Sequence, residues 1–465
     1  MSEAQVSENN NYLTQPIGKL FLTTALPIIM IMVVNGLFNL VDAYFLGIFV
    51  GSAALTAVTV MFPVQMLIYS LTTMISNGFA SIVARRLGAK DLRGAADSFA
   101  VAIVMGSVVS VVLMLAFLGF GHQLVVWVTN GDPDLTAMAW TYMSIMMFTS
   151  PLIFILSVQF DALRSEGKMG FMTLVSISVT LLNMLFNYVF IVMLDMGVAG
   201  SAWGTVAAQL CSLSAIMTYR FLGYSKLGFH MPNMATFMRV AKENLALGAP
   251  LSLNYLSISL IAGSVVAMLK IYGSQDYTVT VGAYGIITRL MTFSFMPLLG
   301  ITMAFQSIAG NNYGGNQPAR VNISTKTALI VAFVYCLVIE VVFISFASQI
   351  AGSFVNDVKM ISETARVLPW VMIMYFTAGP AIILSGFYQA IGDAKRAAIL
   401  SLSRNYLIGL PLLFAVPRFL GEQGIWIASP IGDVIMIGLT IVVLMTAQKR
   451  KGYRGGVFLP VAASR

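Results

Sequence analysis

Three polar side chains stand at helical spacing in the first apolar stretch of the chain. Asn35, Asn39 and Asp42 follow an i, i+4, i+7 pattern, so a helix would present all three on one face. A carboxylate inside a membrane costs at least about 2.5–3.5 kcal/mol, which makes Asp42 a candidate for function. Two amides beside it would orient the carboxylate, and the pattern predicts a proton or cation site. The alternative is an Asp42 that only caps or hydrogen-bonds the outer end of its helix.

A second polar group repeats this spacing further along the chain. Asn183 and Asn187 are four residues apart, and Thr205 comes early in the next apolar stretch, after Gly197-Val-Ala-Gly. We expect them to complete an oxygen-rich cluster with Asp42. Oxygen ligands suit hard cations such as Na⁺, although Asn oxygens alone bind weakly. The alternative is helix–helix packing through small and amide side chains.

The second half carries charges of its own inside apolar stretches. Because each charge relieves the burial of the other, a structural ion pair of Arg404 with Glu340 or Asp433 is the favoured interpretation. Arg289, near the outer third of its stretch, can extend its charged end to the membrane surface. Further polar side chains are candidates for contact with a substrate in a cavity, with helix packing as the alternative: Asn35, Gln65, Tyr69, Asn77, Asn254, Tyr255 and Gln306.

The elements that position these residues are predicted to be transmembrane helices. Of the 465 residues, 58% are hydrophobic and 9% are charged, whereas soluble proteins carry about 25% charged residues. Since a helix needs about 20 apolar residues to cross a membrane, the sequence predicts an all-α polytopic membrane protein with twelve spans. We place the spans at 20–47, 53–84, 95–120, 137–163, 168–194, 197–222, 243–272, 279–310, 321–348, 365–390, 395–419 and 423–447.

The charges predict the direction of these spans. Twelve spans put both termini on one side, and 20 of the 26 Lys and Arg residues fall on that side. Positive charge marks the cytoplasmic side, so both termini are expected there. The predicted organisation is a cytoplasmic tail at 1–19, a six-helix bundle at 20–222, a cytoplasmic linker at 223–242, a second six-helix bundle at 243–447 and a basic cytoplasmic tail at 448–465.

The second half repeats the first. Gly78-Phe-Ala-Ser-Ile aligns with Ala304-Phe-Gln-Ser-Ile, Phe148-Thr149 with Phe376-Thr377, and Pro27 with Pro250. Six spans per repeat run in the same direction in both copies, which predicts two bundles related by a pseudo-two-fold axis along the membrane normal, as in transporters that alternate access by rocking. Chance similarity between apolar helices is the alternative, but glycines, prolines and loop positions match as well as the aliphatic residues.

Several classes of protein lack support in the sequence. No Gly-x-x-x-x-Gly-Lys-Ser/Thr loop is present, so the chain carries no ATPase motif of its own. His122 and His230 lie in separate predicted loops, and Cys211 and Cys336 lie in apolar stretches, which leaves a metalloenzyme without a ligand cluster. We therefore expect a transporter driven by an ion gradient rather than an enzyme, with no metal and no cofactor other than the coupling ion.

Six motifs in order resemble the multidrug and toxic compound extrusion (MATE) family, over residues of about 16 to 448. They are Asn39-Leu-Val-Asp-Ala-Tyr-Phe-Leu-Gly, Ala84-Arg-Arg-Leu-Gly-Ala-Lys-Asp, the segment Asn183 to Asn187, Met196-Gly-Val-Ala-Gly-Ser-Ala-Trp-Gly-Thr, Gln389-Ala-Ile-Gly-Asp and Gly424-Ile-Trp-Ile-Ala-Ser-Pro. Arg404 and the Gly424 segment resemble the MepA-type bacterial branch most.

The resemblance implies how the ion is coupled. Asp42 matches the carboxylate of helix 1 in the family, and Pro27 matches the proline at which helix 1 is proposed to bend on protonation. Asn183 and Thr205 match further members of the ion site, beside Asn39. Asn187 departs from the family, because many relatives carry Asp there, and this favours H⁺ over Na⁺. Gly248-Ala-Pro is followed by no acid, unlike the NorM-type branch, so coupling is expected in the first half.

The resemblance also implies the substrates and the location. MATE transporters export amphiphilic, often cationic, drugs in exchange for H⁺ or Na⁺, and we expect small molecules and membrane lipid as partners, no nucleic acid, and a monomer in the bacterial inner (plasma) membrane. The alternative function is a flippase for lipids or lipid-linked precursors. A flippase cavity for phosphate headgroups would present several inward Arg or Lys residues, and this chain offers at most Arg289 and Arg404.

Overall fold

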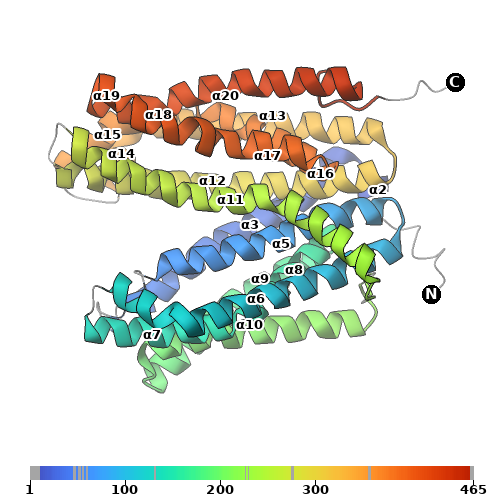
Figure 1. Ribbon diagram of the computed structural model, residues 1–465, viewed down its shortest axis with the longest axis horizontal. Helices are drawn as coiled ribbons and strands as arrows, with labels where there is room; N and C mark the ends of the chain where they lie inside the picture. The colour runs from blue at the N-terminus through green and yellow to red at the C-terminus, as the bar shows by residue number, and fades with distance from the viewer. Residues whose placement is uncertain are drawn as a thin grey trace. The chain divides into compact units, whose positions relative to one another are not determined.

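A computed structural model describes residues 11–45, 49–50, 54, 57–58, 61–129, 132–225, 227–228, 230–273, 277–353 and 358–460. These residues form helices joined by short loops (Figure 1). Nine described helices are long and apolar enough to cross a membrane, and eleven if each of two bent pairs counts as one span. Helix α10 (Gly197–Phe221) covers the remaining predicted span. Each of the twelve predicted spans thus overlaps a helix or a bent helix pair.

The helices follow the predicted spans closely in both halves. The first half contains α2 (Asn11–Thr14), α3 (Ile17–Phe45), α5 (Phe62–Gly88), α6 (Leu92–Val128), α7 (Pro133–Phe148), α8 (Ser150–Ser165), α9 (Met169–Asn187), the π-helix η2 (Tyr188–Met193) and α10. The second half contains α11 (Met234–Tyr272), α12 (Tyr277–Gly314), α13 (Pro318–Ser345), α14 (Ala347–Gly352), α15 (Val358–Met372), the 3-10 helix η3 (Tyr375–Thr377), α16 (Ala378–Ala390), α17 (Ala394–Leu402), the π-helix η4 (Ser403–Gly409), α18 (Leu410–Ala415), α19 (Pro417–Leu420) and α20 (Glu422–Lys451).

The chain divides into two compact units. Unit 1 contains residues 1–14 and 26–252, and unit 2 contains residues 15–25 and 253–465. The division differs from the predicted bundles because α3 and α11 each contribute to both units. Pro27 lies just after the boundary in α3, and Pro250 lies just before the boundary in α11. A proline removes one backbone hydrogen bond of a helix, so both helices are weakened where the chain passes between units.

The first part of α11 is held in unit 1 by close contact with α5. Gly248 packs directly against the backbone carbonyl of Met74, where a larger residue would have no room. The Ser70 hydroxyl donates to the Ser252 carbonyl at 3.0 Å. Further along, Arg85 pairs with Glu243 at 2.6 Å. Small residues let these backbones approach, as is common between helices in membranes.

The close approach at Gly248 predicts a loss of stability on substitution. In Gly248→Ala the added Cβ would overlap the Met74 carbonyl, so we expect a lower midpoint of thermal unfolding in detergent, with a cost of about 1–3 kcal/mol. Gly263→Ala is the matched control, because a Cβ at this position of the same helix meets open space. Equal unfolding temperatures for the two variants would show that the close approach of Gly248 to the Met74 carbonyl does not affect stability.

The fourth span of each half is broken at the aligned motif. Helices α7 and α8 meet at an angle of 49° around Thr149, and α15 and α16 are bent by 42° around η3. At each break a threonine hydroxyl donates back to a carbonyl of the preceding turn, from Thr149 to Ile145 at 2.7 Å and from Thr377 to Met374 at 2.8 Å. The bend at the same place in both halves therefore supports the predicted internal repeat.

The end of the chain packs onto unit 2 over its described part. After Gly452, which ends α20 with φ +70°, the chain turns so that Arg454 pairs with Phe458. The Tyr388 hydroxyl donates to the Gly456 carbonyl at 2.7 Å, and Asn322 bonds the backbone of Leu459 at 2.8 and 2.9 Å. Val457 and Leu459 are buried. The segment 452–460, within the predicted basic tail at 448–465, is thus a docked hairpin.

Candidate functional site

A chain of buried amides links two helices of unit 1. The Asn187 amide donates to Asn183 Oδ1 at 3.1 Å, and the Asn183 amide donates to Thr205 Oγ1 at 3.1 Å. Both asparagine side chains are fully buried, and Thr205 is 9% exposed. Buried amides are stable only when they are hydrogen-bonded. The structure brings together these three predicted residues, and we call them the amide relay.

Local sequence explains how α9 and α10 come close enough for this relay. Asp195 and Gly197 take positive φ values of 49° and 55°, which turn the chain sharply between the two helices. Gly200 and Gly204 then lie against the end of the preceding helix, Gly200 beside Phe190 and Gly204 beside Asn187. Two glycines four residues apart form a flat helix face, and Asn187 fits against it.

Asn187 also marks a change in helix type. It is the last residue of α9, and η2 continues the same span as a π-helix. π-helical turns are rare, and they occur often at functional sites. The fifth span of the second half contains the π-helix η4, so both halves have this feature. Hydropathy alone gave no signal for it.

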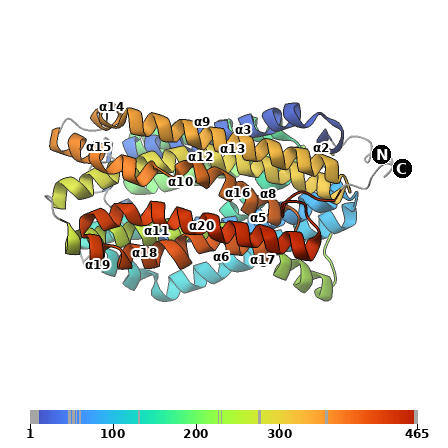
Figure 2. The same cartoon turned by 90° about the horizontal axis from the view of Figure 1, so that it is seen from above.

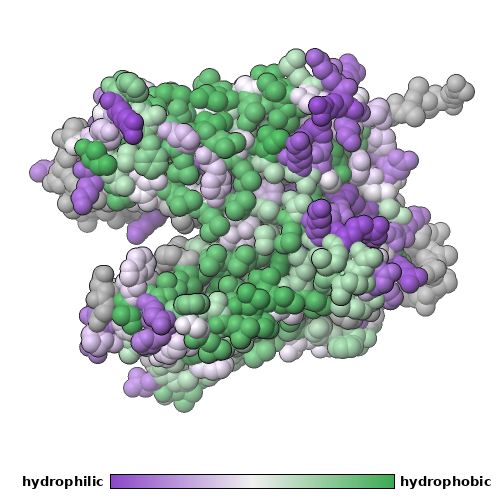
Figure 3. Space-filling model, viewed as in Figure 1, coloured by the Kyte–Doolittle hydropathy of each residue, from purple (hydrophilic) through white to green (hydrophobic). Residues whose placement is uncertain are grey.

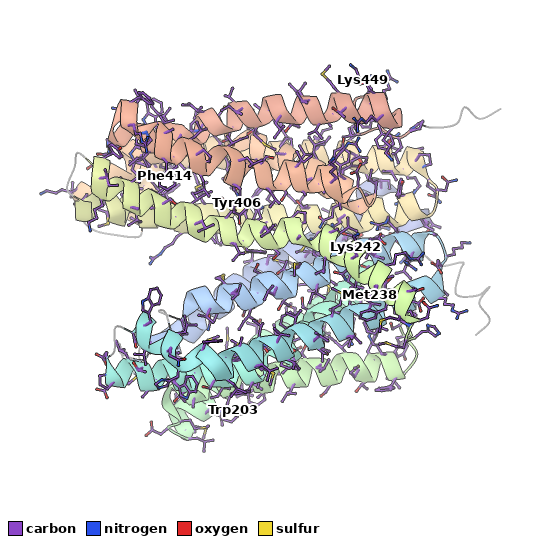
Figure 4. The ribbon with its side chains drawn as sticks, in the orientation of Figure 1. Trp203, Met238, Lys242, Tyr406, Phe414 and Lys449 are labelled. Atoms are coloured by element: carbon purple, nitrogen blue, oxygen red, sulfur yellow. The ribbon has the colours of Figure 1, made fainter. Side chains whose placement is uncertain are left out.

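The fit of Asn187 against Gly204 predicts a functional loss. In Gly204→Ala the Cβ would overlap Asn187 Oδ1 and displace the amide from Asn183. A lost buried hydrogen bond costs about 1–1.5 kcal/mol, so we expect transport to fall by about five- to tenfold at unchanged expression. Trp203→Phe is the control, because Trp203 is the neighbouring residue and is 42% exposed (Figure 4). Normal transport in Gly204→Ala would argue against a role for the relay.

The predicted carboxylate lies on α3. The backbone of this helix includes Asn35, Asn39 and Asp42, but their side chains lie outside the part of the chain that the structure describes. Pro27 lies inside the same helix, fifteen residues before Asp42. The predicted cluster of Asp42 with the amide relay therefore stays a prediction.

The other polar candidates of unit 1 have different surroundings. The Gln65 amide donates to the Tyr142 hydroxyl at 2.9 Å, beside a buried apolar cluster that includes Met146 and Ile153. Tyr69 is 42% exposed. Asn77 is buried, and its carbonyl oxygen has no hydrogen-bond partner among the described residues. Sequence reasoning missed Tyr142, because one tyrosine in an apolar helix carries no distinguishing pattern.

The buried charges of unit 2 separate into two sites. Arg404 Nε donates to Asp433 Oδ1 at 2.8 Å, which selects Asp433 from the two partners that the sequence allowed. Glu340 instead accepts the backbone N–H of Phe376 at 2.8 Å, at the break of the fourth span. An accepting carboxylate there satisfies a donor that the broken helix leaves free. Arg289 is exposed and forms no ion pair with a described carboxylate.

The π-helix η4 presents three adjacent polar residues. Beside Arg404, the Asn405 amide donates to Asn254 Oδ1 at 2.7 Å, and the Tyr406 hydroxyl donates to the Leu253 carbonyl at 2.7 Å (Figure 4). Of the other candidates in unit 2, Tyr255 is half-buried and Gln306 is buried. The sequence analysis did not single out Asn405 and Tyr406. Consecutive residues of a regular α-helix point in different directions, so three adjacent polar residues do not form a recognisable polar face.

The two halves share two backbone features, a broken fourth span and a π-helical turn in the fifth span. Comparison with known protein families identifies the chain. A family model described as MatE matches residues 27–189 and 250–415. The chain belongs to the MatE family. It is a multi-pass membrane transporter and not an enzyme, as the sequence predicted.

Similar proteins support this assignment. MATE relatives include the multidrug export protein MepA of Staphylococcus aureus, 19% identical over 410 residues that cover 88% of this chain and 89% of MepA. The probable multidrug resistance protein YoeA of Bacillus subtilis is 24% identical over 416 residues, or 87% of this chain and 88% of YoeA.

Solved MATE structures share the fold. A MATE transporter in a bent conformation has a TM-score of 0.85 at 22% identity, covering 97% of this chain and 99% of that one. A MOP superfamily transporter from Pyrococcus furiosus has a TM-score of 0.84 at 22% identity, covering 95% of this chain and 99% of that one. The predicted fold class, an all-α protein with twelve transmembrane helices in two six-helix bundles, is confirmed.

Proposed function

We propose that this MATE transporter exports amphiphilic, often cationic, compounds in exchange for cations that enter the cell, and that H⁺ is the coupling ion rather than Na⁺. The multidrug activity in the names of MepA and YoeA supports the substrate class. The transporter would act as a monomer in the plasma membrane of a bacterium, with both termini in the cytoplasm. The observation that carries the proposal is the buried amide relay of Asn187, Asn183 and Thr205.

The chemistry of the relay favours a proton over a metal ion. Its two internal hydrogen bonds already use the oxygens of Asn183 and Thr205 as acceptors. A Na⁺ ion would need several such oxygens directed toward it at once. A proton needs one titratable group, and Asp42 on α3 is the candidate that the sequence provides.

Coupling requires that the two protonation states of Asp42 favour different conformations. A ligand shifts an equilibrium only by its difference in affinity for the two states. We propose that a proton from outside neutralises Asp42, that α3 then bends at Pro27, and that the cavity of the first half shrinks and displaces the bound compound. The position of Pro27, beside the boundary between the two units, supports this as the place where α3 bends.

Resistance of living cells tests the substrate class. The chain is expressed in bacteria that lack their own efflux pumps, and growth is measured against cationic dyes and against neutral and anionic compounds of similar size. We expect increased resistance to the amphiphilic cations. Cells that remain as sensitive as vector controls to every amphiphilic cation, with the protein present in the membrane, would refute this substrate class.

A further inference from the structure

Unit 2 contains a groove at the end of α20 that the transport mechanism does not use. It has a volume of about 680 Å³ and lies between the last turns of α20 and the start of α17. Tyr313, at the end of α12, and Tyr453, in the docked hairpin, also line it. Helices α17 and α20 run beside each other in both views (Figures 1 and 2). Its lining combines two kinds of surface.

One face of α20 changes from apolar to basic along the groove. Leu439, Val442, Val443, Thr446 and Arg450 all line the groove and follow the spacing of one helix face. The residues before Thr446 are aliphatic, and those after it are charged. The surface shows the same change, from hydrophobic residues along the helix to hydrophilic residues at its end (Figure 3).

The basic end of the groove has an excess of positive charge. Its lining contains Lys395, Arg396, Arg450 and Lys451, and the one carboxylate in the lining is Asp393. Asp393 is paired with Arg396 and also accepts the backbone N–H of that residue. Lys395, Arg450 and Lys451 form no ion pair with any carboxylate in the described ranges. Three positive charges therefore remain for an external anion.

The dimensions of the groove match one leaflet of a membrane. From Leu439 to Arg450 the helix rises about 16 Å, at 1.5 Å per residue. Half of the hydrocarbon core of a bilayer is about 15 Å thick. An acyl chain lying along the aliphatic face would thus place its headgroup at the basic end. A free phosphate would fill only that end.

The hairpin that carries Tyr453 is held against unit 2 by contacts of its own. Gly456 of the docked hairpin packs closely against Leu444 of α20, and its carbonyl accepts the Tyr388 hydroxyl. These contacts hold Tyr453 beside the basic residues. A groove that needs no rearrangement loses less conformational entropy on binding.

We propose that this groove binds an anionic phospholipid of the cytoplasmic leaflet. The phosphate lies among Lys395, Arg450 and Lys451, and one acyl chain lies along Leu439 and Val442. Basic pockets beside transmembrane helices on the cytoplasmic side are suited to acidic headgroups. The leaflet follows from the proposed cytoplasmic position of the termini, but the site is independent of Asp42 and of drug transport.

Native mass spectrometry of the purified full chain tests the lipid site. The protein in detergent is titrated with phosphatidylglycerol, with phosphatidylcholine of the same acyl chains, and with inorganic phosphate. We expect phosphatidylglycerol to bind about tenfold more tightly than phosphatidylcholine, because its headgroup carries a net negative charge whereas that of phosphatidylcholine carries none. Equal binding of the two lipids, or full competition by inorganic phosphate at equal concentration, would overturn the proposal.

Two double variants locate the binding. Arg450→Gln/Lys451→Gln removes two charges from the lining and should abolish the preference for phosphatidylglycerol. Lys449→Gln/Arg454→Gln removes the same charge from the same segment outside the lining, and should keep the preference (Figure 4). Equal loss in both variants would mean general attraction to the basic surface and would overturn a specific site. Asp42→Asn should retain the preference, so failure of the proposed transport mechanism is detected separately.

Discussion

Replacing Asp42 by Asn is expected to reduce drug resistance to the level of cells without the transporter. Asn keeps the size and polarity of the side chain but cannot change its charge. The two states of α3 then no longer differ in proton affinity, and the coupling disappears. Coupling free energies between sites are about 1–3 kcal/mol, so we expect a loss of coupled transport of about 5- to 150-fold.

The measurement is resistance at equal expression, with Asp134→Asn as the control. Asp134 is an exposed carboxylate in the first turn of α7, in the same half of the chain. Its replacement changes the net charge by the same amount and should leave resistance unchanged. Resistance of Asp42→Asn cells at the level of the unmodified chain would refute coupling through Asp42.

Breaking the Arg404–Asp433 pair is expected to cause the largest loss of stability. In Asp433→Asn the guanidinium of Arg404 keeps its charge and loses its carboxylate. Removing one partner of a fully buried pair costs about 3–5 kcal/mol. Because the Arg404 side chain is 33% exposed and that of Asp433 is 6% exposed, we expect a smaller loss than for a fully buried pair, about 2–3 kcal/mol.

Thermal unfolding in detergent measures this loss against two further variants. Arg404→Met/Asp433→Leu removes both charges and should recover most of the stability, because no charge is left buried without a partner. Arg86→Gln removes one partner of an exposed pair, Arg86–Asp91, and should cost less than about 1 kcal/mol. If the double variant were as unstable as Asp433→Asn, the pair would not be the cause.

Much of the architecture could be predicted from the sequence, because the apolar residues that give the hydropathy signal are the ones that form the spans, and the repeated motifs lie at corresponding places in the two halves. Apolar stretches predicted the spans, and Phe148-Thr149 and Phe376-Thr377 aligned where both fourth spans are broken. The π-helices η2 and η4 were not predictable, because a change from i, i+4 to i, i+5 bonding leaves the apolar pattern nearly unchanged. The docked hairpin was missed, since Val457 and Leu459 are too few to give a periodic signal.

The site was predictable where spacing along one helix decides the contact. Asn183 and Asn187 are four residues apart, and their hydrogen bond follows directly from that spacing. Contacts between distant helices depend on tertiary packing, so Asn254 with Asn405 was not foreseen. Glu340 was one of the two expected ion-pair partners of Arg404, but it accepts the backbone N–H of Phe376 where the fourth span is broken. The sequence does not show which backbone N–H groups a break leaves without a partner in the helix.

Transport by proteoliposomes tests the central claim most directly. The purified chain and Asp42→Asn are reconstituted, and movement of a fluorescent cationic dye is followed under an imposed pH gradient and then under a Na⁺ gradient. The proposed mechanism predicts dye transport that follows the pH gradient, is absent with Na⁺ alone, and is lost in Asp42→Asn. Transport that follows Na⁺ instead, or that survives the substitution under the pH gradient, would contradict proton antiport through Asp42.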